Sequence, residues 1–203
     1  QCYADHGCEV PARLLRFFCQ PALHNPLRAD AEARQPAACF FGSWYSQYPE
    51  RAVALDHAIA LFEGRAPVHI YDRNYDRADP AFAFPSRYAA MRRSSVPFDE
   101  VPALCKQYTF GINMNTVTGS PSMYSRRIHE MAACRTVVVT NFSPAAFSDY
   151  GDTLIYTNRS DASARIETVL ENGGQDMAAN AALDIVMTHH VARIRLAQLV
   201  QEV

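Results

Sequence analysis

Short apolar segments alternate with longer segments of helical periodicity along most of this sequence. Five short segments, rich in β-branched and aromatic residues, predict strands at residues 37–41, 68–71, 109–114, 136–140 and 154–156. Helices are predicted between and after them, at residues 49–62, 98–107, 121–134, 161–170 and 177–200. Strands separated by helices usually pair in parallel through right-handed crossovers. The pattern therefore predicts an α/β domain with three α/β/α layers and a mainly parallel sheet.

Prolines and small polar residues mark the expected starts of two helices. Pro49 stands where the first turn of the helix at 49–62 is predicted. Ser120 and Pro121 are typical of an N-cap and of the first helical position. The helix at 121–134 is therefore expected to begin directly after Ser120.

The first thirty residues differ from the rest of the chain. Pro21 and Pro26 punctuate residues 20–26, as is typical of a linker. At 203 residues the chain is long enough for one well-buried domain and too short for two of full size. We expect residues 31–203 to form that domain. The chain opens at Gln1 on an incomplete structural unit, so we expect it to be part of a longer protein.

Composition limits the partners that this chain is expected to have. Its 19 basic and 21 acidic residues give a formal net charge of −2, which provides no reason to expect nucleic acid or an anionic membrane as a partner. No apolar run approaches the length of a membrane span, and no secretory leader is visible. A cytoplasmic location is the expectation.

The cysteines and histidines show no metal-binding pattern. The six cysteines fall at irregular intervals without a CxxC pair, so we expect buried free thiols. His189 and His190 are adjacent on a predicted helix, which is a poor geometry for chelating one metal ion, and we expect them at or near the surface. Neither a metal nor a cofactor is predicted.

Polar residues follow three of the predicted strands. They are Gly42, Ser43, Trp44 and Arg51 after the first strand, Asp72, Arg73 and Asn74 after the second, and residues 113–127 after the third. In open parallel sheets, ligands bind beyond the carboxyl ends of the strands, where helix N-termini offer unpaired amide N–H groups. The third group is the most specific, because residues 116–120 lead into a predicted helix that carries Ser122 and Tyr124 in its first turn. A diphosphate would fit this geometry.

Common catalytic signatures are missing from the sequence. It contains no GxSxG, GxxxxGK[ST], HExxH or GxGxxG motif. Their absence argues against the most frequent hydrolases, NTPases, metalloproteases and dehydrogenases.

The third group lies within a longer motif. It runs from Asn113-Met114-Asn115 through Ser120-Pro121-Ser122-Met123 to Arg126-Arg127-Ile128-His129-Glu130-Met131-Ala132-Ala133-Cys134. This order resembles the "LNxN…SPTMxxRRxFExxACG" core of CgeB-like glycosyltransferases, bacterial relatives of the retaining GT-B enzymes. Further matches lie at residues 40–45, 70–75, 84–88 and 190–195. The resemblance extends from about residue 20 to the end of the chain.

The resemblance implies a fold and a division of labour. In such enzymes a C-terminal Rossmann-like domain binds the nucleotide sugar, and a separate N-terminal domain presents the acceptor. By this resemblance, residues 31–203 are the donor-binding domain, and residues 1–30 are the tail of an N-terminal domain with the interdomain linker. The acceptor is unknown, and a cell-surface polysaccharide or a protein is expected.

The resemblance also implies roles for single residues. Glu130 matches a glutamate that accepts hydrogen bonds from the donor ribose, although an ordinary helix-surface pair with Arg126 is the alternative. Arg51 is expected at the diphosphate, with a solvated helix arginine beside Glu50 as the alternative. Arg73 is expected there too, with a local pair to Asp72 that makes the loop rigid as the alternative. Trp44 is either a stacking platform or part of the core. The complete predicted donor site is Gly42, Ser43, Trp44, Arg51, Asp72, Arg73, Asn113, Asn115, Ser122, Met123, Tyr124, Arg126, Arg127 and Glu130.

Two positions depart from the pattern. Ser122 stands where many retaining relatives carry a second glutamate, eight positions before Glu130, and Arg135 replaces the glycine that usually follows "AC". Retention or inversion of the anomeric centre therefore stays open, and no catalytic residue is assigned. Sugar transfer from a nucleoside diphosphate sugar is the leading hypothesis. A non-catalytic nucleotide-sugar-binding or interaction module is the alternative, and a GT-B-shaped epimerase ranks last.

Overall fold

The computed structural model describes residues 14–28, 34–171 and 175–201 of the chain. Its centre is a six-stranded sheet in the order β3-β2-β1-β4-β5-β6, in which every adjacent pair is parallel. The strands are β1 (Gln35–Gly42), β2 (Val68–Asp72), β3 (Arg92–Arg93), β4 (Tyr108–Asn113), β5 (Val137–Thr140) and β6 (Ile155–Tyr156). The predicted parallel sheet is confirmed, and β3 is a short edge strand that the sequence did not reveal.

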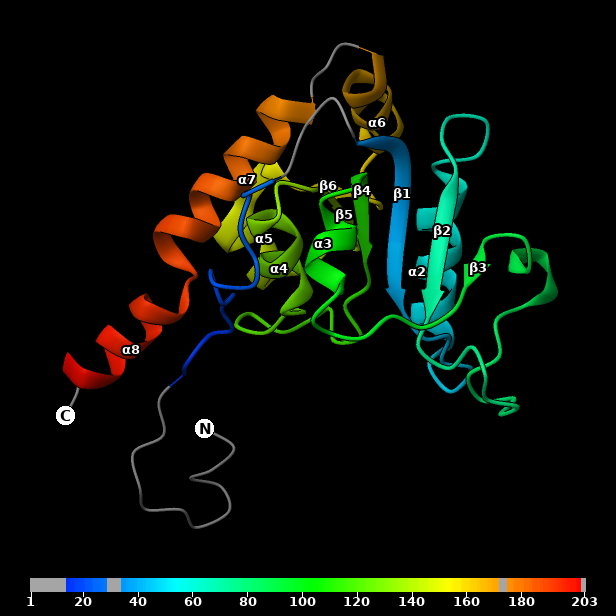
Figure 1. The fold of residues 1–203 in the computed structure, drawn as a ribbon, viewed down its shortest axis with the longest axis horizontal. Coiled ribbons are helices and arrows are strands. Elements are labelled where there is room, and N and C mark those ends of the chain that lie inside the picture. The colour runs from blue at the N-terminus through cyan, green and yellow to red at the C-terminus, as the bar shows by residue number, and fades with distance from the viewer. Residues whose placement is uncertain (1–13, 29–33, 172–174, 202–203) are drawn as a thin grey trace.

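Helices cover both faces of the sheet (Figure 1). One face carries α2 (Pro49–Ala60) and α6 (Ala162–Glu171). The other carries α3 (Val101–Cys105), α4 (Arg127–Ala133), α5 (Pro144–Tyr150) and α7 (Gln175–His189), and α8 (Ala192–Gln201) follows α7. Short 3₁₀ turns occupy Ser86–Tyr88 and Gly151–Thr153. The predicted three-layer α/β/α architecture is therefore confirmed.

Alternation along the central strand β1 divides the core into two layers. Ala38 and Phe40 pack with α2 and α6, whereas Cys39 and Phe41 pack with α3, α4 and α7. Successive side chains of a strand point to opposite faces, so one apolar strand can supply both layers. Gly111 on β4 lies directly beneath α4, where an added Cβ would be 2.6 Å from the sulfur of Met131. This glycine allows the close approach of α4 to the sheet.

The helix predicted at 121–134 is wrong in its first half. The hydroxyl of Ser120 accepts hydrogen bonds from the backbone N–H groups of Ser122 and Met123, at 3.3 and 3.1 Å. The amide oxygen of Asn115 accepts the N–H of Ser125 at 2.8 Å. These side chains hold the segment as a loop, and the helix begins only at Arg127.

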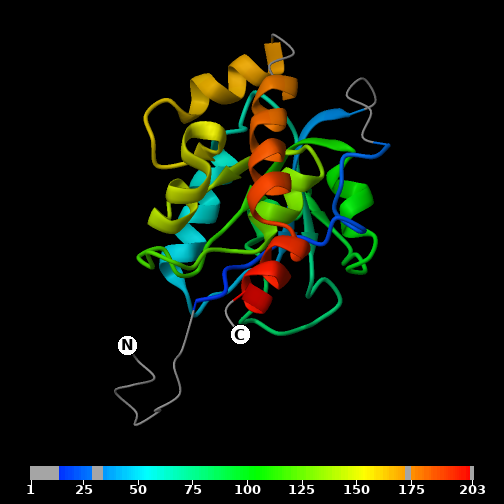
Figure 2. The same cartoon turned by 90° about the vertical axis from the view of Figure 1, so that its left-hand side faces the viewer.

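The single helix predicted at 177–200 is in fact two helices. At the break, Val191 forms a parallel bridge with Cys19 of the N-terminal segment. The N–H of Cys19 bonds to the carbonyl of His190 at 2.9 Å, and the N–H of Ala192 bonds to the carbonyl of Cys19 at 3.1 Å. The strand-like contact takes the backbone groups that a continuous helix would have used. Figure 2 shows α8 turning away from the end of α7 beside this segment.

Other expectations are corrected or confirmed by burial. His190 is 6% exposed and therefore buried, contrary to the expected surface position, whereas His189 is exposed. Cys19, Cys39, Cys105 and Cys134 are free and buried, as predicted, and Cys2 and Cys8 lie outside the described residues. The expected boundary between residues 30 and 31 also lies outside them. Across the described part of the chain, every helix is too short or too polar to cross a membrane.

Candidate functional site

A cavity of about 170 Å³ lies between the carboxyl ends of β1 and β4. The chain leaves these two neighbouring strands in opposite directions across the sheet, toward β2 and toward β5. This is the topological switch point at which open α/β sheets bind ligands. The cavity is lined by Phe40, Phe41, Gly42, Ser43, Tyr45, Arg51, Arg73, Ile112, Asn113, Met114, Thr116, Ser125 and Arg127. We call it the arginine cavity.

Three arginines from three different elements meet at the arginine cavity. Arg51 comes from the first turn of α2, Arg73 from the loop after β2, and Arg127 from the first position of α4. Arg51 is 9% exposed, donates to the carbonyl of Ser43 at 3.0 Å, and lies 4.8 Å from the centre of the Tyr45 ring. Its guanidinium is thus fixed at the end of β1 instead of lying in solvent.

Arg127 connects the arginine cavity with two neighbouring cavities. It lines one of about 280 Å³ that also touches Tyr71, Val96 and Phe98, and one of about 340 Å³ that also touches Glu130. Its Nε is buried and has no hydrogen-bond partner. Buried polar atoms are normally paired, so the hydrogen bonding of this guanidinium is not completed by the protein itself.

The arginine cavity is positively charged. None of the described residues that line it carries a carboxylate. Burial lowers the pKa of Arg127, with Glu130 opposing and Arg73 adding to the shift. Burial also lowers the pKa of Arg51, where Tyr45 opposes and the charge of Arg127 adds to the shift. An anion in the cavity would relieve the mutual repulsion of the arginines.

Gly42 keeps the floor of the arginine cavity open. It is the last residue of β1 and lines two of the cavities. A Cβ at this position would lie 2.8 Å from the ring of Phe40. A side chain here would force Phe40 to move.

The amides of Asn113 and Asn115 hold the loop beside the cavity. Asn113 donates to Asn115 at 3.2 Å and to the hydroxyl of Thr140 at 3.0 Å. Asn115 donates to Thr140 and to the carbonyl of Asn141, both at 3.2 Å, and Asn141 donates to the carbonyl of Asn115 at 2.9 Å. This network joins the ends of β4 and β5, so both asparagines line cavities but their side chains position the loop.

Glu130 forms an ion pair and also faces a cavity. Its carboxylate lies 2.7 Å from the Nε of Arg126, and its side chain is only 5% exposed. Arg126 is half exposed and lies 5.5 Å from the centre of the Phe98 ring. The pair with Arg126 is therefore present, but at the wall of a cavity that adjoins the arginine cavity and not on an open helix surface.

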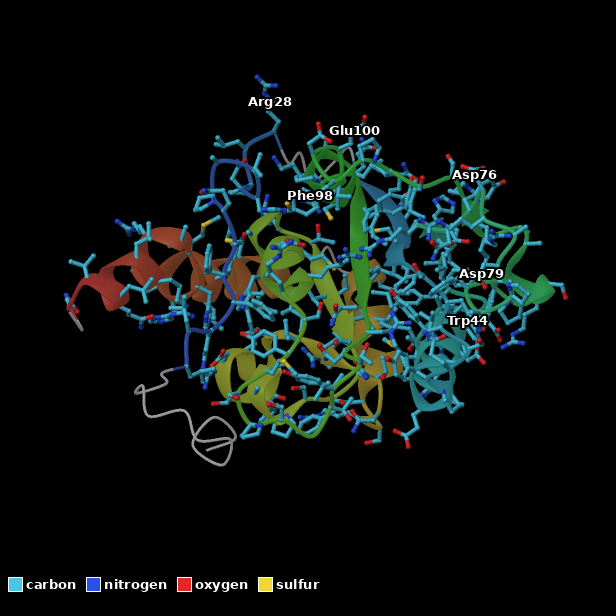
Figure 3. All side chains as sticks on the ribbon, turned by 90° about the horizontal axis from the view of Figure 1, so that it is seen from below. Arg28, Trp44, Asp76, Asp79, Phe98 and Glu100 are labelled. Atoms are coloured by element: carbon cyan, nitrogen blue, oxygen red, sulfur yellow. The ribbon has the colours of Figure 1, made fainter. Side chains whose placement is uncertain are left out.

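Five other predicted residues lie away from the arginine cavity. Trp44 is 8% exposed and packs against Phe84 and Tyr88 in the core, on the opposite side of the sheet from Phe98 (Figure 3). Asp72 is fully buried and pairs with Arg92 at 2.8 Å.

The remaining three, Ser122, Met123 and Tyr124, lie in the loop before α4. The backbone N–H of Ser122 bonds to Ser120, and the hydroxyl of Tyr124 donates to Asp149 at 2.7 Å. Tyr124 and the half-exposed Met123 line a cavity of about 230 Å³ beside the arginine cavity.

Sequence reasoning missed several residues at this edge. Tyr45, Phe98 and Ser125 line the cavities; Tyr45 and Ser125 lie in matched segments but were given no site role, and Phe98 lies in no motif. His24 is 3% exposed, packs edge-on against Phe98 at 6.1 Å, and has no hydrogen-bond partner at either ring nitrogen. Burial lowers the pKa of His24, with the charge of Glu130 opposing. The only sequence signal for Phe98 was an aromatic residue just before α3 that no predicted element explained.

A family profile described as glycosyl transferase-like matches residues 51–201. The chain belongs to this family. No curated protein sequence matches this member of the family.

Solved structures share the fold of this glycosyl transferase-like chain. Sucrose-phosphate synthase from Thermosynechococcus elongatus has a TM-score of 0.67 at 12% identity, over 98% of this chain and 54% of the synthase. Anabaena HepE in complex with UDP-glucose has a TM-score of 0.66 at 15% identity, over 91% of this chain and 55% of HepE. The chain spans about half the length of these proteins, and its fold is the Rossmann-like fold of GT-B glycosyltransferases.

Proposed function

We propose that this chain binds a nucleoside diphosphate sugar and forms the donor site of a glycosyltransferase. The arginine cavity carries the proposal, because three guanidinium groups meet there at the switch point of the sheet. A planar guanidinium can donate two parallel hydrogen bonds to phosphate oxygens. In a chain of the glycosyl transferase-like family, the diphosphate of a nucleotide sugar is the anion that suits such a cavity.

The cavities beside Arg127 suit the nucleoside. The Glu130 carboxylate can accept hydrogen bonds from both ribose hydroxyls, which are about twice as strong as bonds between neutral groups. Phe98, on the far side of Arg126, offers an exposed ring against which a base can stack. Ribose, diphosphate and base would then occupy three adjoining spaces that share Arg127.

The same residues can assist the transfer step. The bond between the anomeric carbon and the diphosphate breaks, the acceptor hydroxyl forms the new bond and loses its proton, and the nucleoside diphosphate leaves. Negative charge grows on the leaving diphosphate, and Arg51, Arg73 and Arg127 line the cavity in which we place it, with Arg51 already fixed by Ser43. Such preorganised charge lowers the barrier because little reorganisation is needed. In this proposal the donor is a substrate, and the arginines need no cofactor.

The motif between Asn113 and Cys134 supports a finer placement. We place the chain in the CgeB-like branch, as the donor-binding half of a bacterial, cytoplasmic enzyme with a cell-surface polysaccharide or a protein as acceptor. The span of the match, about half of each solved relative, agrees with one half of a GT-B enzyme. Transfer by this chain alone is then expected to be slow, because a GT-B active site is completed across the cleft between two domains.

A binding module without catalysis is the second candidate. Ser122, in place of an acidic residue, favours it, because no carboxylate is supplied at that point of the loop. The two candidates predict the same donor binding and differ in turnover once the acceptor is present.

Calorimetric titration of the chain with UDP, GDP, dTDP and their sugar derivatives tests the proposal. We expect at least one nucleoside diphosphate to bind. Arg127→Met should weaken that binding about tenfold to a hundredfold for each charge-assisted hydrogen bond lost. Arg65→Met is the matched control, because Arg65 pairs with Glu167 on the surface. Failure of every nucleotide to bind, or wild-type affinity in Arg127→Met, would contradict the proposal.

A further inference from the structure

One wall of the cavity beside Glu130 comes from a distant part of the chain. The cavity, of about 340 Å³, is lined by Phe17, Ser125, Arg126, Arg127 and Glu130, and we call it the Glu130 cavity. The last four belong to α4 or to the two residues before it. Phe17 comes from the N-terminal segment at residues 14–28 and is the only apolar side chain among these described lining residues. The cavity therefore lies between this segment and the start of α4.

Phe17 also borders a second space. The cavity of about 230 Å³ beside Met123 shares Phe17 and Ser125 with the Glu130 cavity. Phe17 is 49% exposed, so about half of it is not covered by the protein. A donor whose ribose lies at Glu130 would meet this ring, whether or not its other parts extend into the second space.

Two anchors in the chain hold Phe17 in place. On one side, the guanidinium of Arg16 forms an ion pair with the carboxylate of Asp149 on α5. On the other side, Cys19 is 1% exposed and forms the parallel bridge with Val191, with its N–H bonded to the carbonyl of His190 at 2.9 Å. A residue between two such contacts has little freedom to move, so the fold sets the position of the Phe17 ring.

Asp149 holds the opposite wall of the Glu130 cavity as well. Its second carboxylate oxygen accepts the hydroxyl of Tyr124 at 2.7 Å. Tyr124 directly precedes Ser125, which lines both the Glu130 cavity and the arginine cavity. Asp149 itself lines neither of these cavities, and its side chain is 12% exposed. One half-hidden carboxylate thus joins the N-terminal segment to the loop before α4.

We propose that Phe17 contacts the bound donor and that Asp149 is a positioning residue, which holds the walls on both sides of the donor through Arg16 and Tyr124. This inference rests on the proposed function. The arginines and Glu130 can bind phosphates and hydroxyls, whereas the C–H groups of a sugar ring need an apolar surface. An aromatic ring packed against them removes apolar area from water. The N-terminal segment, expected from the sequence to be only a tail and linker, is then part of the donor site.

Calorimetric titration of Phe17 variants with UDP, GDP and dTDP tests the contact. Phe17→Ala should weaken the nucleotide that binds by about threefold to tenfold, because part of one apolar side chain is lost. Phe17→Tyr keeps the aromatic face and should bind as the wild type does. Leu14→Ala is the matched control, because Leu14 is 63% exposed on the same segment and lines neither cavity that Phe17 lines. Wild-type affinity in Phe17→Ala overturns the inference alone, whereas no binding of any of the three nucleotides to the wild type overturns the proposed function with it.

Arg16 variants test the positioning role of Asp149. Arg16→Met breaks the ion pair and should weaken the same nucleotide about as much as Phe17→Ala, and Arg16→Lys should restore the affinity. Because Arg16 acts through Phe17, the double variant should bind within about twofold of Phe17→Ala. A change that only lowered stability would give no such coupling. Additive losses in the double variant, or wild-type affinity in Arg16→Met, overturn the positioning role.

Discussion

The two edges of the central sheet use buried arginine in opposite ways. At the amino edge, Arg34 is 7% exposed and donates to the carbonyls of Tyr108 and Cys134, at 2.8 and 2.9 Å. At the carboxyl edge, Arg51 and Arg127 each bury an Nε that has no hydrogen-bond partner, and both face a cavity. Buried polar groups are normally paired. The contrast separates an arginine whose hydrogen bonds the fold satisfies from arginines whose hydrogen bonding the protein does not complete.

This difference has a structural cause. The carbonyls of Tyr108, at the beginning of β4, and of Cys134, at the end of α4, accept hydrogen bonds from Arg34. These fixed dipoles stabilise its positive charge. At the opposite edge, the strands end and helix α4 begins at Arg127, where N–H groups outnumber carbonyls. An arginine placed there finds few acceptors within the protein. In the proposed function, the diphosphate of the donor would supply them.

The largest expected effect is on stability at the amino edge. Arg34→Met leaves the carbonyls of Tyr108 and Cys134 buried without their donor, and each costs about 1–3 kcal/mol. We expect the free energy of unfolding to fall by about 3 kcal/mol in urea titrations, with the affinity of the surviving folded protein for nucleotide unchanged. Arg65→Met, which removes a surface arginine, should change stability by less than about 1 kcal/mol. Lost nucleotide affinity in folded Arg34→Met would break the contrast between the edges.

At the carboxyl edge, Glu130→Gln tests the ribose assignment. The variant keeps the size and one acceptor oxygen but loses the charge, so donor affinity should fall roughly tenfold to a hundredfold. Calorimetric titration measures it. Arg126→Gln is the control that removes only the partner of the ion pair. If both variants shift stability equally, by about 0.2–0.5 kcal/mol, and neither changes affinity, Glu130 serves the pair alone.

The fold could be predicted because its periodicity is local. The five predicted strands correspond to five of the six observed, since period and β-branched composition are properties of neighbouring residues. Helix α5 (Pro144–Tyr150) was not predicted, although Ser143 and Pro144 are a local start signal. The two misplaced helix boundaries have distant causes. The loop before α4 is held by Asn115, and the break after α7 is held by the segment around Cys19. No local pattern contains these contacts.

The site could be predicted only in part for the same reason. Arg126 and Arg127 are adjacent in the motif, and which one faces the cavity depends on where α4 begins. The structure exposes half of Arg126 and buries the Nε of Arg127. With the helix predicted to begin at Pro121, the sequence could not show which of these two arginines faces the cavity. Trp44, for which the sequence allowed two roles, lies in the core because Phe84 and Tyr88, about forty residues later in the chain, pack against it.

A buried histidine extends the comparison to pH. Burial lowers the pKa of His190 to about 4, with Asp149 opposing and Arg195 adding to the shift, and its Nδ1 lies 2.8 Å from Arg195. The unfolded chain titrates near 6.5, so below that pH it binds a proton that the folded protein does not. Stability should therefore fall as the pH drops from about 6.5 toward 4, by about 2 kcal/mol at pH 5.

Urea midpoints measured between pH 7.5 and pH 5 check this prediction. His129 is also buried and its pKa is lowered well below the usual value by burial, with His190 adding to the shift, so it contributes in the same direction. His190→Gln should flatten the pH dependence. His189→Gln is the control, because the neighbouring side chain is exposed. An equal pH dependence in His190→Gln and in the wild type would assign the effect to other groups.

The smallest expected effect returns to the amino edge, at Arg135. This residue follows Cys134, the C-cap of α4, and has a φ of 61°, a left-handed conformation that costs about 1–2 kcal/mol for a residue with a Cβ. Its Nε donates to Asn180 at 2.8 Å, so a substitution removes that bond as well. Comparing Arg135→Gly with Arg135→Ala cancels the lost bond and leaves the backbone term. Glycine's greater freedom in the unfolded chain offsets about 0.5–1 kcal/mol of the gain. Arg135→Gly should therefore be more stable than Arg135→Ala by about 0.5–1 kcal/mol in urea unfolding. In an ordinary helix interior the order is reversed, so an alanine variant as stable as the glycine variant would show that the turn relaxes out of the left-handed region.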